Sequence, residues 1–328
     1  MLKMSFPLKD FLFAPAQPLK GLLPIEWLTV GYVAFTSVLM LVFGSRMSNI
    51  TDMLILRAAA LCVVCLGWYL NKKFALQGIY MLRIACLVGL LAFWYPDLYE
   101  VSRIFPNADH VFASLEQSTF GCQPALLFSQ SCTSRFLSEC FYMGYLFYFP
   151  MIAILLVYYF FTRHSDFERT ATILLGAFFT YYLIFLFLPV AGPQYYFNAI
   201  GPDTAAAGTF PAVGMWFDAD TTMMDPPGWK DGLFYNLLEV IRHSERPVAS
   251  FPSSHVGIST IVILFAFQTR SKGLLSVLLP LWVLLCFATV FIRAHYLIDV
   301  IAGLATAPLV FLLLNKIIPA SSTLKEQS

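Results

Sequence analysis

The sequence predicts an all-α fold, a polytopic transmembrane helical bundle with about eight spans. Of the 328 residues, 59% are hydrophobic and only 12% are charged, whereas a soluble domain usually carries about 25% charged residues. Apolar stretches long enough to cross roughly 30 Å of hydrocarbon recur along the chain. The formal net charge is +1, so no strongly basic field indicates a nucleic-acid partner. These observations exclude an ordinary water-soluble globule and make membrane lipids the expected surroundings.

Eight apolar segments define the expected spans. In chain order they are 26–44, 53–70, 78–96, 141–162, 170–190, 254–268, 273–292 and 294–315. The sixth is short for a full crossing, and Arg57 and Arg83 fall inside the second and third, where a charge is costly. We expect an N-terminal region with two extra helices (1–77), a six-helix catalytic core (78–316) and a cytoplasmic tail (317–328).

The distribution of Lys and Arg predicts the orientation. If both termini lie on one side, that side receives Lys3, Lys9, Lys20, Lys72, Lys73, Arg163, Arg169, Arg270, Lys272, Lys316 and Lys325. The other side receives Arg46, Arg103, Arg135, Lys230, Arg242 and Arg246 in longer loops. The first side is therefore expected to be cytoplasmic, and loops 97–140 and 191–253 to face outward. We expect an integral protein of a bacterial inner membrane, with its site facing the periplasm or exterior.

Three cysteines, Cys122, Cys132 and Cys140, fall in the first outward loop. An oxidising compartment would permit one disulfide among them and leave one thiol over. Free thiols near the membrane surface are an equally open alternative.

A first polar segment, Ser250-Phe251-Pro252-Ser253-Ser254-His255, opens the sixth expected span. Pro and Ser are common at helix starts, where the first backbone N–H groups have no partner within the helix. Such N–H groups form a seat for phosphate. The structural alternative is that Pro252 and Ser253 only cap a helix while His255 lies at headgroup level.

A second polar segment, Arg293-Ala294-His295-Tyr296-Leu297-Ile298-Asp299, joins the seventh and eighth spans. His295 and Asp299 are four residues apart and would share a helical face, so the carboxylate is expected to accept the ring N–H. That bond would fix the tautomer and make the other ring nitrogen a better nucleophile. The structural alternative is a His–Asp bond that only joins helices.

The expected topology places both segments at the outward ends of spans. His255, Arg293, His295 and Asp299 would therefore converge on one cavity at the membrane surface. Two histidines, an arginine and a carboxylate suit phosphoryl transfer, in which catalysis is mostly positioning and neutralisation of negative charge.

At these residues the chain resembles the type 2 phosphatidic acid phosphatase superfamily. That superfamily also includes the soluble vanadium haloperoxidases and membrane phosphotransferases such as inositol phosphorylceramide and sphingomyelin synthases. Its second motif, P-S-G-H, is matched by residues 252–255, with Ser254 in place of glycine. The resemblance covers roughly 78–316 and implies a six-helix membrane core that acts on phosphate esters.

The third motif of the family, S-R-x-x-x-x-x-H-x-x-x-D, is matched at His295 and Asp299. Ala288 and Thr289 occupy its Ser-Arg positions, so the family arginine is missing there. Arg293 follows Thr289 by four residues, and we expect it to supply the charge from the next helical turn. The segment H-Y-L-I-D looks like the version found in the membrane phosphotransferase branch.

The first motif, K-x-x-x-x-x-x-R-P, is the main departure from the family. Aligning Pro193 with its proline puts Gly192 at the arginine position and Phe185 at the lysine position. Two phosphate-binding cations are thus absent, which puts simple hydrolysis of phosphatidate in doubt. Gln194 and Tyr195, which follow at this place, are candidate substrate-binding residues.

The resemblance implies a role for each matched residue. His295 would attack phosphorus and carry a phosphohistidine, Asp299 would orient it, and His255 would act as general acid and base. Arg293, Ser253 and Ser254, with backbone N–H groups, would hold the phosphate oxygens. No metal or other cofactor is expected, because the remaining histidines show no ligand spacing.

The loop 191–253 is long for a compact fold and is expected to roof the cavity. It carries Lys230, Arg242 and Arg246, and we expect at least one of them to replace the missing first-motif cations. Its stretch 232–242 is expected to form a short helix at the membrane interface.

The sequence thus predicts an enzyme whose partners are a lipid phosphate and membrane lipids. Water as acceptor would make it a phosphatase, and a polyol or second lipid would make it a phosphotransferase. The alternative is a transporter or binding protein that uses His255, His295 and Asp299 as a proton or anion relay. The sequence fixes neither the lipid, the acceptor nor the oligomeric state.

Overall fold

The computed structural model describes residues 8–16, 21–47, 49–132 and 134–318, and every regular element in these ranges is a helix. The helices are α1 (Leu8–Leu12), α2 (Pro24–Phe43), α3 (Ile50–Phe74), α4 (Gln77–Gly89), α5 (Leu91–Ser102), α6 (Asp109–Phe120), α7 (Pro124–Ser131), α8 (Arg135–Leu146), α9 (Tyr148–Thr162), α10 (His164–Phe187), α11 (Pro193–Ile200), α12 (Pro202–Ala206), α13 (Leu233–Arg242), α14 (Ser254–Thr269), α15 (Lys272–Phe291) and α16 (Leu297–Ile317). Short 3-10 turns lie at Gly44–Arg46 and Trp216–Asp218. The predicted all-α polytopic bundle is confirmed. The predicted tail, 317–328, lies outside the described residues from 319 onward.

Each of the eight expected spans is helical in the structure, but not every one is a single helix long enough to cross a membrane. Six spans in the described ranges are long and apolar enough to cross a membrane, namely α2, α3, the joined α4 and α5, α10, α15 and α16. The pair α8 and α9 also passes this test but bends by 52° at its junction, and α14 has only 16 residues. By length and composition, the described residues thus hold six full-length spans, or seven with the bent pair, and α14 is a shorter apolar helix at the place of the remaining expected span.

The bend between α8 and α9 has a local cause. Pro150 lies in the first turn of α9. In a continuous helix its ring would clash with the carbonyl of residue 146, and its nitrogen could not donate a hydrogen bond. The helix therefore ends at Leu146 and restarts at Tyr148. This break turns the residues on either side of it toward the cavity described below.

The two arginines inside expected spans are neutralised by buried carboxylates. Arg57 on α3 donates two hydrogen bonds to Asp97 on α5, at 2.6 and 2.7 Å. Arg83 on α4 donates two to Glu26 on α2, at 2.8 and 2.6 Å. Such bidentate pairs make a charge tolerable inside a bundle. They also join the two N-terminal helices to the helices that follow.

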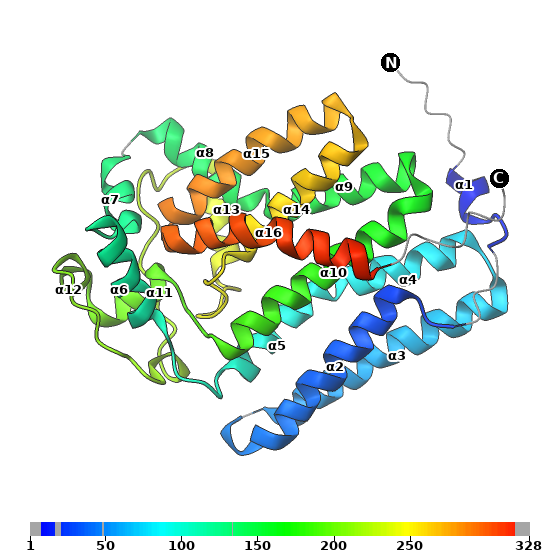
Figure 1. Cartoon of the computed structure of the whole chain (residues 1–328), viewed down its shortest axis with the longest axis horizontal. Coiled ribbons are helices and arrows are strands. Elements are labelled where there is room, and N and C mark those ends of the chain that lie inside the picture. The colour runs from blue at the N-terminus through cyan, green and yellow to red at the C-terminus, as the bar shows by residue number, and fades with distance from the viewer. Residues whose placement is uncertain (1–7, 17–20, 48, 133, 319–328) are drawn as a thin grey trace.

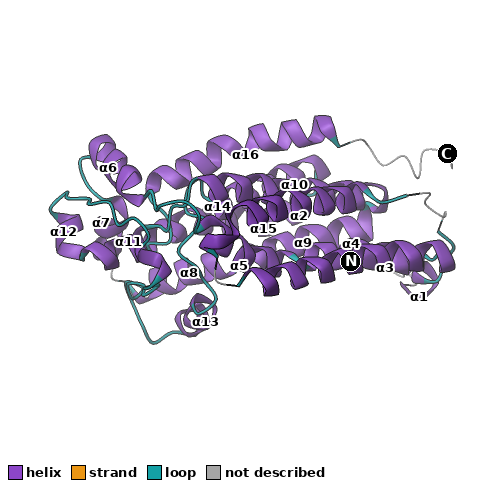
Figure 2. Cartoon of the chain, turned by 90° about the horizontal axis from the view of Figure 1, so that it is seen from below, coloured by secondary structure: helices purple, strands orange, loops and turns teal. Residues whose placement is uncertain are grey.

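The loops that were expected to face outward gather at one end of the bundle. Figures 1 and 2 show α6, α7, α11 and α12 together at this end, whereas α1 and the C-terminal end of α16 lie at the opposite end. Cys122, Cys132 and Cys140 are free thiols. Of the two alternatives for these cysteines, the structure thus has the free thiols.

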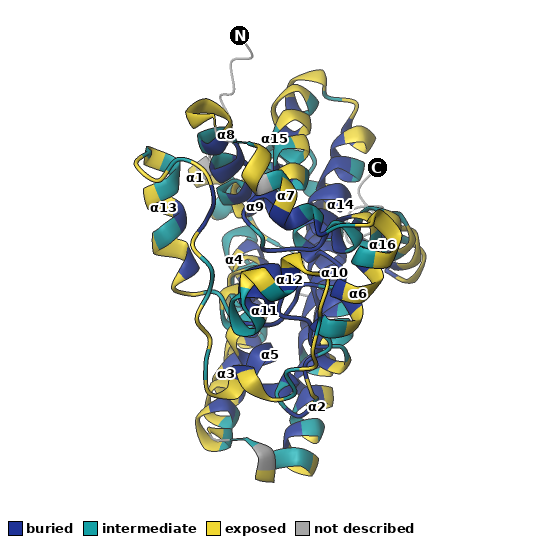
Figure 3. Ribbon diagram, turned by 90° about the vertical axis from the view of Figure 1, so that its left-hand side faces the viewer, coloured by how far each residue is buried: buried dark blue, intermediate teal, exposed yellow. Residues whose placement is uncertain are grey.

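Buried residues concentrate where the helices face one another (Figure 3). Large apolar side chains such as Leu41, Leu309 and Leu312 are instead exposed on the outer faces of α2 and α16. These outward apolar faces suit contact with hydrocarbon.

Helices α14 and α16 approach closely at the centre of the bundle. A Cβ added at Gly303 would lie 2.6 Å from the carbonyl oxygen of Ser253, so only glycine fits there. The backbone N–H of Ser253 donates to the carbonyl of Asp299 at 3.0 Å. The first turns of the two helices are therefore fixed against each other, and both carry residues that the sequence analysis singled out.

Candidate active site

A cavity of about 360 Å³ lies beside the first turn of α14. Helices α5, α8, α9, α10, α11 and α13 contribute to its wall, together with residues 244–246, 248–250 and 294–295. Both histidines predicted to be catalytic, His255 and His295, line it. The structure therefore brings together the two polar segments that lie forty residues apart in the sequence.

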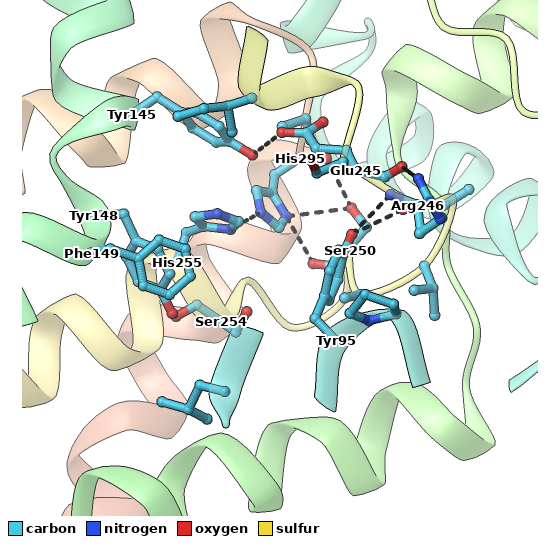
Figure 4. Close-up of a pocket in the computed structure, with 18 of the residues that line it drawn as sticks. Tyr95, Tyr145, Tyr148, Phe149, Glu245, Arg246, Ser250, Ser254, His255 and His295 are labelled. Atoms are coloured by element: carbon cyan, nitrogen blue, oxygen red, sulfur yellow. Dashed lines mark hydrogen bonds between the residues drawn. The ribbon is translucent and has the colours of Figure 1, made fainter. Parts of the chain in front are cut away.

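The two imidazoles face each other directly. Nδ1 of His255 lies 3.2 Å from Nε2 of His295 (Figure 4). Nδ1 of His295 lies 2.9 Å from the carbonyl oxygen of Ser250. A carbonyl oxygen only accepts, so Nδ1 of His295 carries the proton and a neutral ring leaves Nε2 with a lone pair. His255 then donates its Nδ1–H to that lone pair.

Ser250 stands between His295 and the carboxylate predicted to orient it. Its hydroxyl donates to Oδ2 of Asp299 at 2.6 Å, and its Oγ lies 3.4 Å from Nδ1 of His295. Asp299 itself approaches that ring nitrogen to 3.6 Å, which is too long for a hydrogen bond. The expected direct bond is therefore replaced by one to the Ser250 carbonyl, with Asp299 as a nearby countercharge.

This difference has a local reason. Helix α16 begins only at Leu297, so His295 lies before the helix and not one turn below Asp299. Oδ2 of Asp299 instead accepts the backbone N–H of Tyr296 at 2.8 Å, a cap of the first helical turn.

His255 is held by aromatic rings. The ring of Tyr145 stacks on it at a centroid distance of 4.9 Å, and Tyr148 lies 4.4 Å away on a tilted plane. Both tyrosines flank the break between α8 and α9. The bend thus provides the wall that orients His255, a contribution the sequence analysis missed.

The serines of the second motif differ in what they do. Ser253 caps α14, because its Oγ accepts the N–H of Val256 at 3.3 Å, and the residue is fully buried. It is not among the residues that line the cavity, whereas Ser254 is. The geometry of Ser253 matches the capping alternative, and only Ser254 is placed to meet a ligand.

Arg293 does not line the histidine cavity, contrary to expectation. It lines a separate surface hollow with Lys230 and Asp225, and its Nη1 donates to the carbonyl of Asp225 at 3.4 Å. The reason is that α15 ends at Phe291 and Arg293 has a φ of +66°, so the helical register counted from Thr289 does not reach it.

Of the three loop cations, only Arg246 lines the cavity. Lys230 is about half exposed and pairs with Asp225 at 2.8 Å. Arg242 is buried outside the cavity, where it pairs with Glu239 at 2.7 Å and donates to the carbonyl of Met224 at 2.6 Å. Of the three loop cations predicted to replace those of the first motif, Arg246 is therefore the one that the structure places at the cavity.

The first-motif position cannot carry an arginine in this backbone. Gly192 has a φ of +94°, and a Cβ there would collide with the carbonyl oxygen of Ala294, next to His295. Phe185, at the lysine position, is fully buried in the core. The packing around the site therefore excludes both cations of the first motif.

Gln194 and Tyr195, the two substrate-binding candidates after Pro193, both line the cavity. The side-chain amide of Gln194 donates to Oε2 of Glu245 at 2.8 Å, and the hydroxyl of Tyr145 donates to Oε1 at 2.7 Å. Glu245 is a carboxylate within a site expected to bind an anion. The sequence offers no signal for it, since the loop geometry alone brings it there.

Two buried carboxylates on α6 hold the site segments together. Oδ1 of Asp109 accepts from the N–H of Gly192 at 2.8 Å and from the hydroxyl of Tyr296 at 2.9 Å. Oε2 of Glu116 accepts from the N–H of Ile298 at 3.1 Å. Burial raises the pKa of Asp109 to about 6 and that of Glu116 to about 8. Their spacing of seven residues on one helix was the available sequence signal, and sequence analysis missed it.

Comparison with known proteins agrees with this geometry. A family model described as the PAP2 superfamily matches residues 112–313, which include both histidine segments and the α6 residue Glu116. Searches of curated proteins and of solved structures found no match. Because the family match covers well over half of the chain, the protein belongs to the PAP2 superfamily.

Proposed function

We propose that this membrane protein hydrolyses or transfers the phosphate of a lipid phosphate through a phosphohistidine on His295. The observation that carries the proposal is the contact between Nε2 of His295 and Nδ1 of His255, with the tautomer of His295 set by the Ser250 carbonyl. This arrangement presents the nucleophilic lone pair of His295 and, when His255 is protonated, an acidic N–H at one point of the cavity.

In the first half of the proposed reaction, Nε2 of His295 bonds to phosphorus as the bond from phosphorus to the lipid oxygen breaks. His255 enters this step as the imidazolium, gives its Nδ1 proton to that departing oxygen and becomes neutral. The positive charge that develops on His295 is offset by Asp299, whose Oδ2 lies 3.6 Å from the ring.

In the second half, water or an alcohol attacks phosphorus and the bond from phosphorus to Nε2 breaks. His255 takes the proton of the attacking hydroxyl, which restores the starting protonation states. Water yields inorganic phosphate, whereas an alcohol yields a new phosphate ester.

Arg246 supports the assignment of an anionic substrate. A phosphate monoester carries about two negative charges near neutral pH, and Arg246 is the cation from the described ranges that lines the cavity with the two histidines. We assign it the neutralising role that the first motif usually provides.

The mouth of the cavity supports a lipid substrate. Leu91, Phe149 and Ile241 line it, and Phe149 and Ile241 are 60% and 47% exposed. An apolar wall that continues onto the lipid-facing surface lets acyl chains remain in hydrocarbon while the phosphate reaches the histidines. We further propose that this end of the bundle faces the periplasm or exterior of a bacterial inner membrane.

Product analysis tests the proposal. Purified protein is incubated with phosphatidate labelled in its phosphate, with and without added alcohols. Free phosphate or a new phosphate ester, together with diacylglycerol, is the expected result, and a His295→Asn variant should form neither. If a range of lipid phosphates remains intact, the enzyme assignment is wrong and the relay alternative for His255, His295 and Asp299 gains support.

A further inference from the structure

Glu245 is an acidic group in a cavity assigned to a phosphate. Its two carboxylate oxygens accept from Tyr145 at 2.7 Å and from Gln194 at 2.8 Å, so its position is fixed. Each oxygen retains a lone pair for a further donor. A carboxylate repels phosphate, and its presence indicates that this part of the cavity receives a group with hydrogen-bond donors.

Two further polar atoms in the same part of the cavity have no hydrogen-bond partner among the described residues. They are Oε1 of Gln194 and the hydroxyl of Tyr195, in side chains that are 4% and 1% exposed. Buried polar atoms without partners are destabilising unless a ligand satisfies them. The side chain of Gln194 is held in this position by its own amide N–H, which donates to Glu245 at 2.8 Å.

We propose that Glu245, Gln194 and Tyr195 form a subsite for an acceptor alcohol that carries several hydroxyl groups. The inference rests on the proposed function, since it names the acceptor in the second half of that reaction. The hydrogen-bond acceptor atoms are spread over one charged and two neutral side chains. This arrangement suits a ligand with several hydroxyl groups better than a ligand with one ammonium group. The guanidinium of Arg246, which lines the same cavity, also disfavours a cationic ligand.

Tyr145 links this subsite to the reacting histidines. Its hydroxyl is bonded to Glu245 while its ring stacks on His255 at 4.9 Å (Figure 4). A polyol held by Glu245 therefore lies beside the base that takes its proton. One polyol hydroxyl loses its proton to His255 and bonds to phosphorus, the bond from phosphorus to His295 breaks, and a polyol phosphate leaves.

The test measures how the phosphoenzyme divides between water and an added alcohol. Labelled phosphatidate is the donor, and the acceptors are glycerol, 1-propanol and 3-amino-1-propanol at equal concentration. These share a three-carbon chain and differ in hydroxyl number and charge. The ratio of phosphorylated alcohol to free phosphate reports on the second half-reaction alone, so a general loss of activity does not alter it.

We expect the wild-type ratio to be about tenfold higher for glycerol than for 1-propanol, the effect of one hydrogen bond to a charged group. Glu245→Gln should lower the glycerol ratio about tenfold, and Tyr195→Phe, which removes one hydroxyl, severalfold. The matched control Glu239→Gln makes the same chemical change on α13 outside the cavity and should keep the wild-type ratio.

Three results would overturn the subsite: equal ratios for glycerol and 1-propanol, a preference for 3-amino-1-propanol, or an unchanged glycerol ratio in Glu245→Gln. Failure of the proposed function has a different signature, the absence of any phosphatidate breakdown. In that case saturable binding of tritiated inositol decides the matter. Binding that Glu245→Gln weakens about tenfold supports the subsite, and no binding to the wild type overturns it.

Discussion

Nδ1 of His255 and Nε2 of His295 are 3.2 Å apart, which leaves no space for a phosphorus atom between them. A substrate phosphate must therefore break this hydrogen bond and replace it with its own contacts. In the resting state this contact keeps both reactive nitrogens aimed at the same point. Once substrate breaks it, the other contacts of each ring must hold the two histidines in orientation.

Ser250→Ala tests the hydroxyl that lies between His295 and Asp299. The variant keeps the backbone carbonyl that accepts from His295 but removes the hydroxyl bonded to Asp299 at 2.6 Å. We expect kcat to fall about tenfold to a hundredfold with little change in KM, because ring orientation and countercharge act on the chemical step. Ser259→Ala, at a buried serine on α14 that bonds Val256, is the control. An unchanged kcat in Ser250→Ala would remove the Ser250 hydroxyl from the account and leave only its backbone carbonyl.

Gly192→Ala tests why the first-motif arginine is absent. A Cβ at this position combines a φ of +94° with a collision against Ala294. Gly201→Ala is the matched control, since its φ of +86° is similar while the nearest atom lies 3.6 Å away. Both should lose about 1 to 3 kcal/mol of stability from backbone strain, and Gly192→Ala should lose more and also lower activity. If the two variants had equal midpoints of thermal unfolding, the collision between residue 192 and Ala294 would cost no stability and the explanation would be wrong.

Arg246→Ala tests which loop cation meets the phosphate. Loss of a charge-assisted contact should lower kcat/KM for a lipid phosphate about tenfold or more. Lys230→Ala, at an exposed ion pair outside the cavity, should change it less than about twofold. The opposite order would move the phosphate toward the hollow that Arg293 and Lys230 line.

Glu116 makes the free energy of unfolding decrease as the pH rises. Burial raises its pKa from 4.5 to about 8, so between these values the folded chain holds a proton that the unfolded chain has released. Its contribution to stability is present below about pH 4.5 and is lost as the pH rises toward 8. The thermal midpoint should fall over this range, and Glu116→Gln should flatten the fall. A wild-type midpoint that rises steadily from pH 5 to 8, with the variant unchanged from it, would contradict this assignment.

Apolar length and the resulting order of spans were enough to predict the helices and to bring the two histidine segments to one end of the bundle. They could not predict the break before Tyr148 by window averages, because the segment 141–162 is apolar throughout. Pro150 was the signal, and it acts through one backbone clash that hydropathy does not register.

The meeting of the two histidines was predictable because their segments sit at span ends on the same side of the expected bundle. The role of Arg293 was not, because its direction depends on where α15 ends and on a left-handed backbone conformation. Glu245 and Tyr145 reach the cavity through a long loop and a bent helix pair. Their contacts join residues about a hundred positions apart, and no local pattern encodes them.

Trapping the covalent intermediate tests the central claim most directly. Protein mixed with phosphatidate labelled in its phosphate is quenched within milliseconds, denatured and digested, and the labelled peptide is sequenced by mass spectrometry. We expect an acid-labile, base-stable phosphate on His295, and no labelled protein from His295→Asn. Label on His255 or on a serine, or diacylglycerol release at the wild-type rate by His295→Asn, would contradict the account.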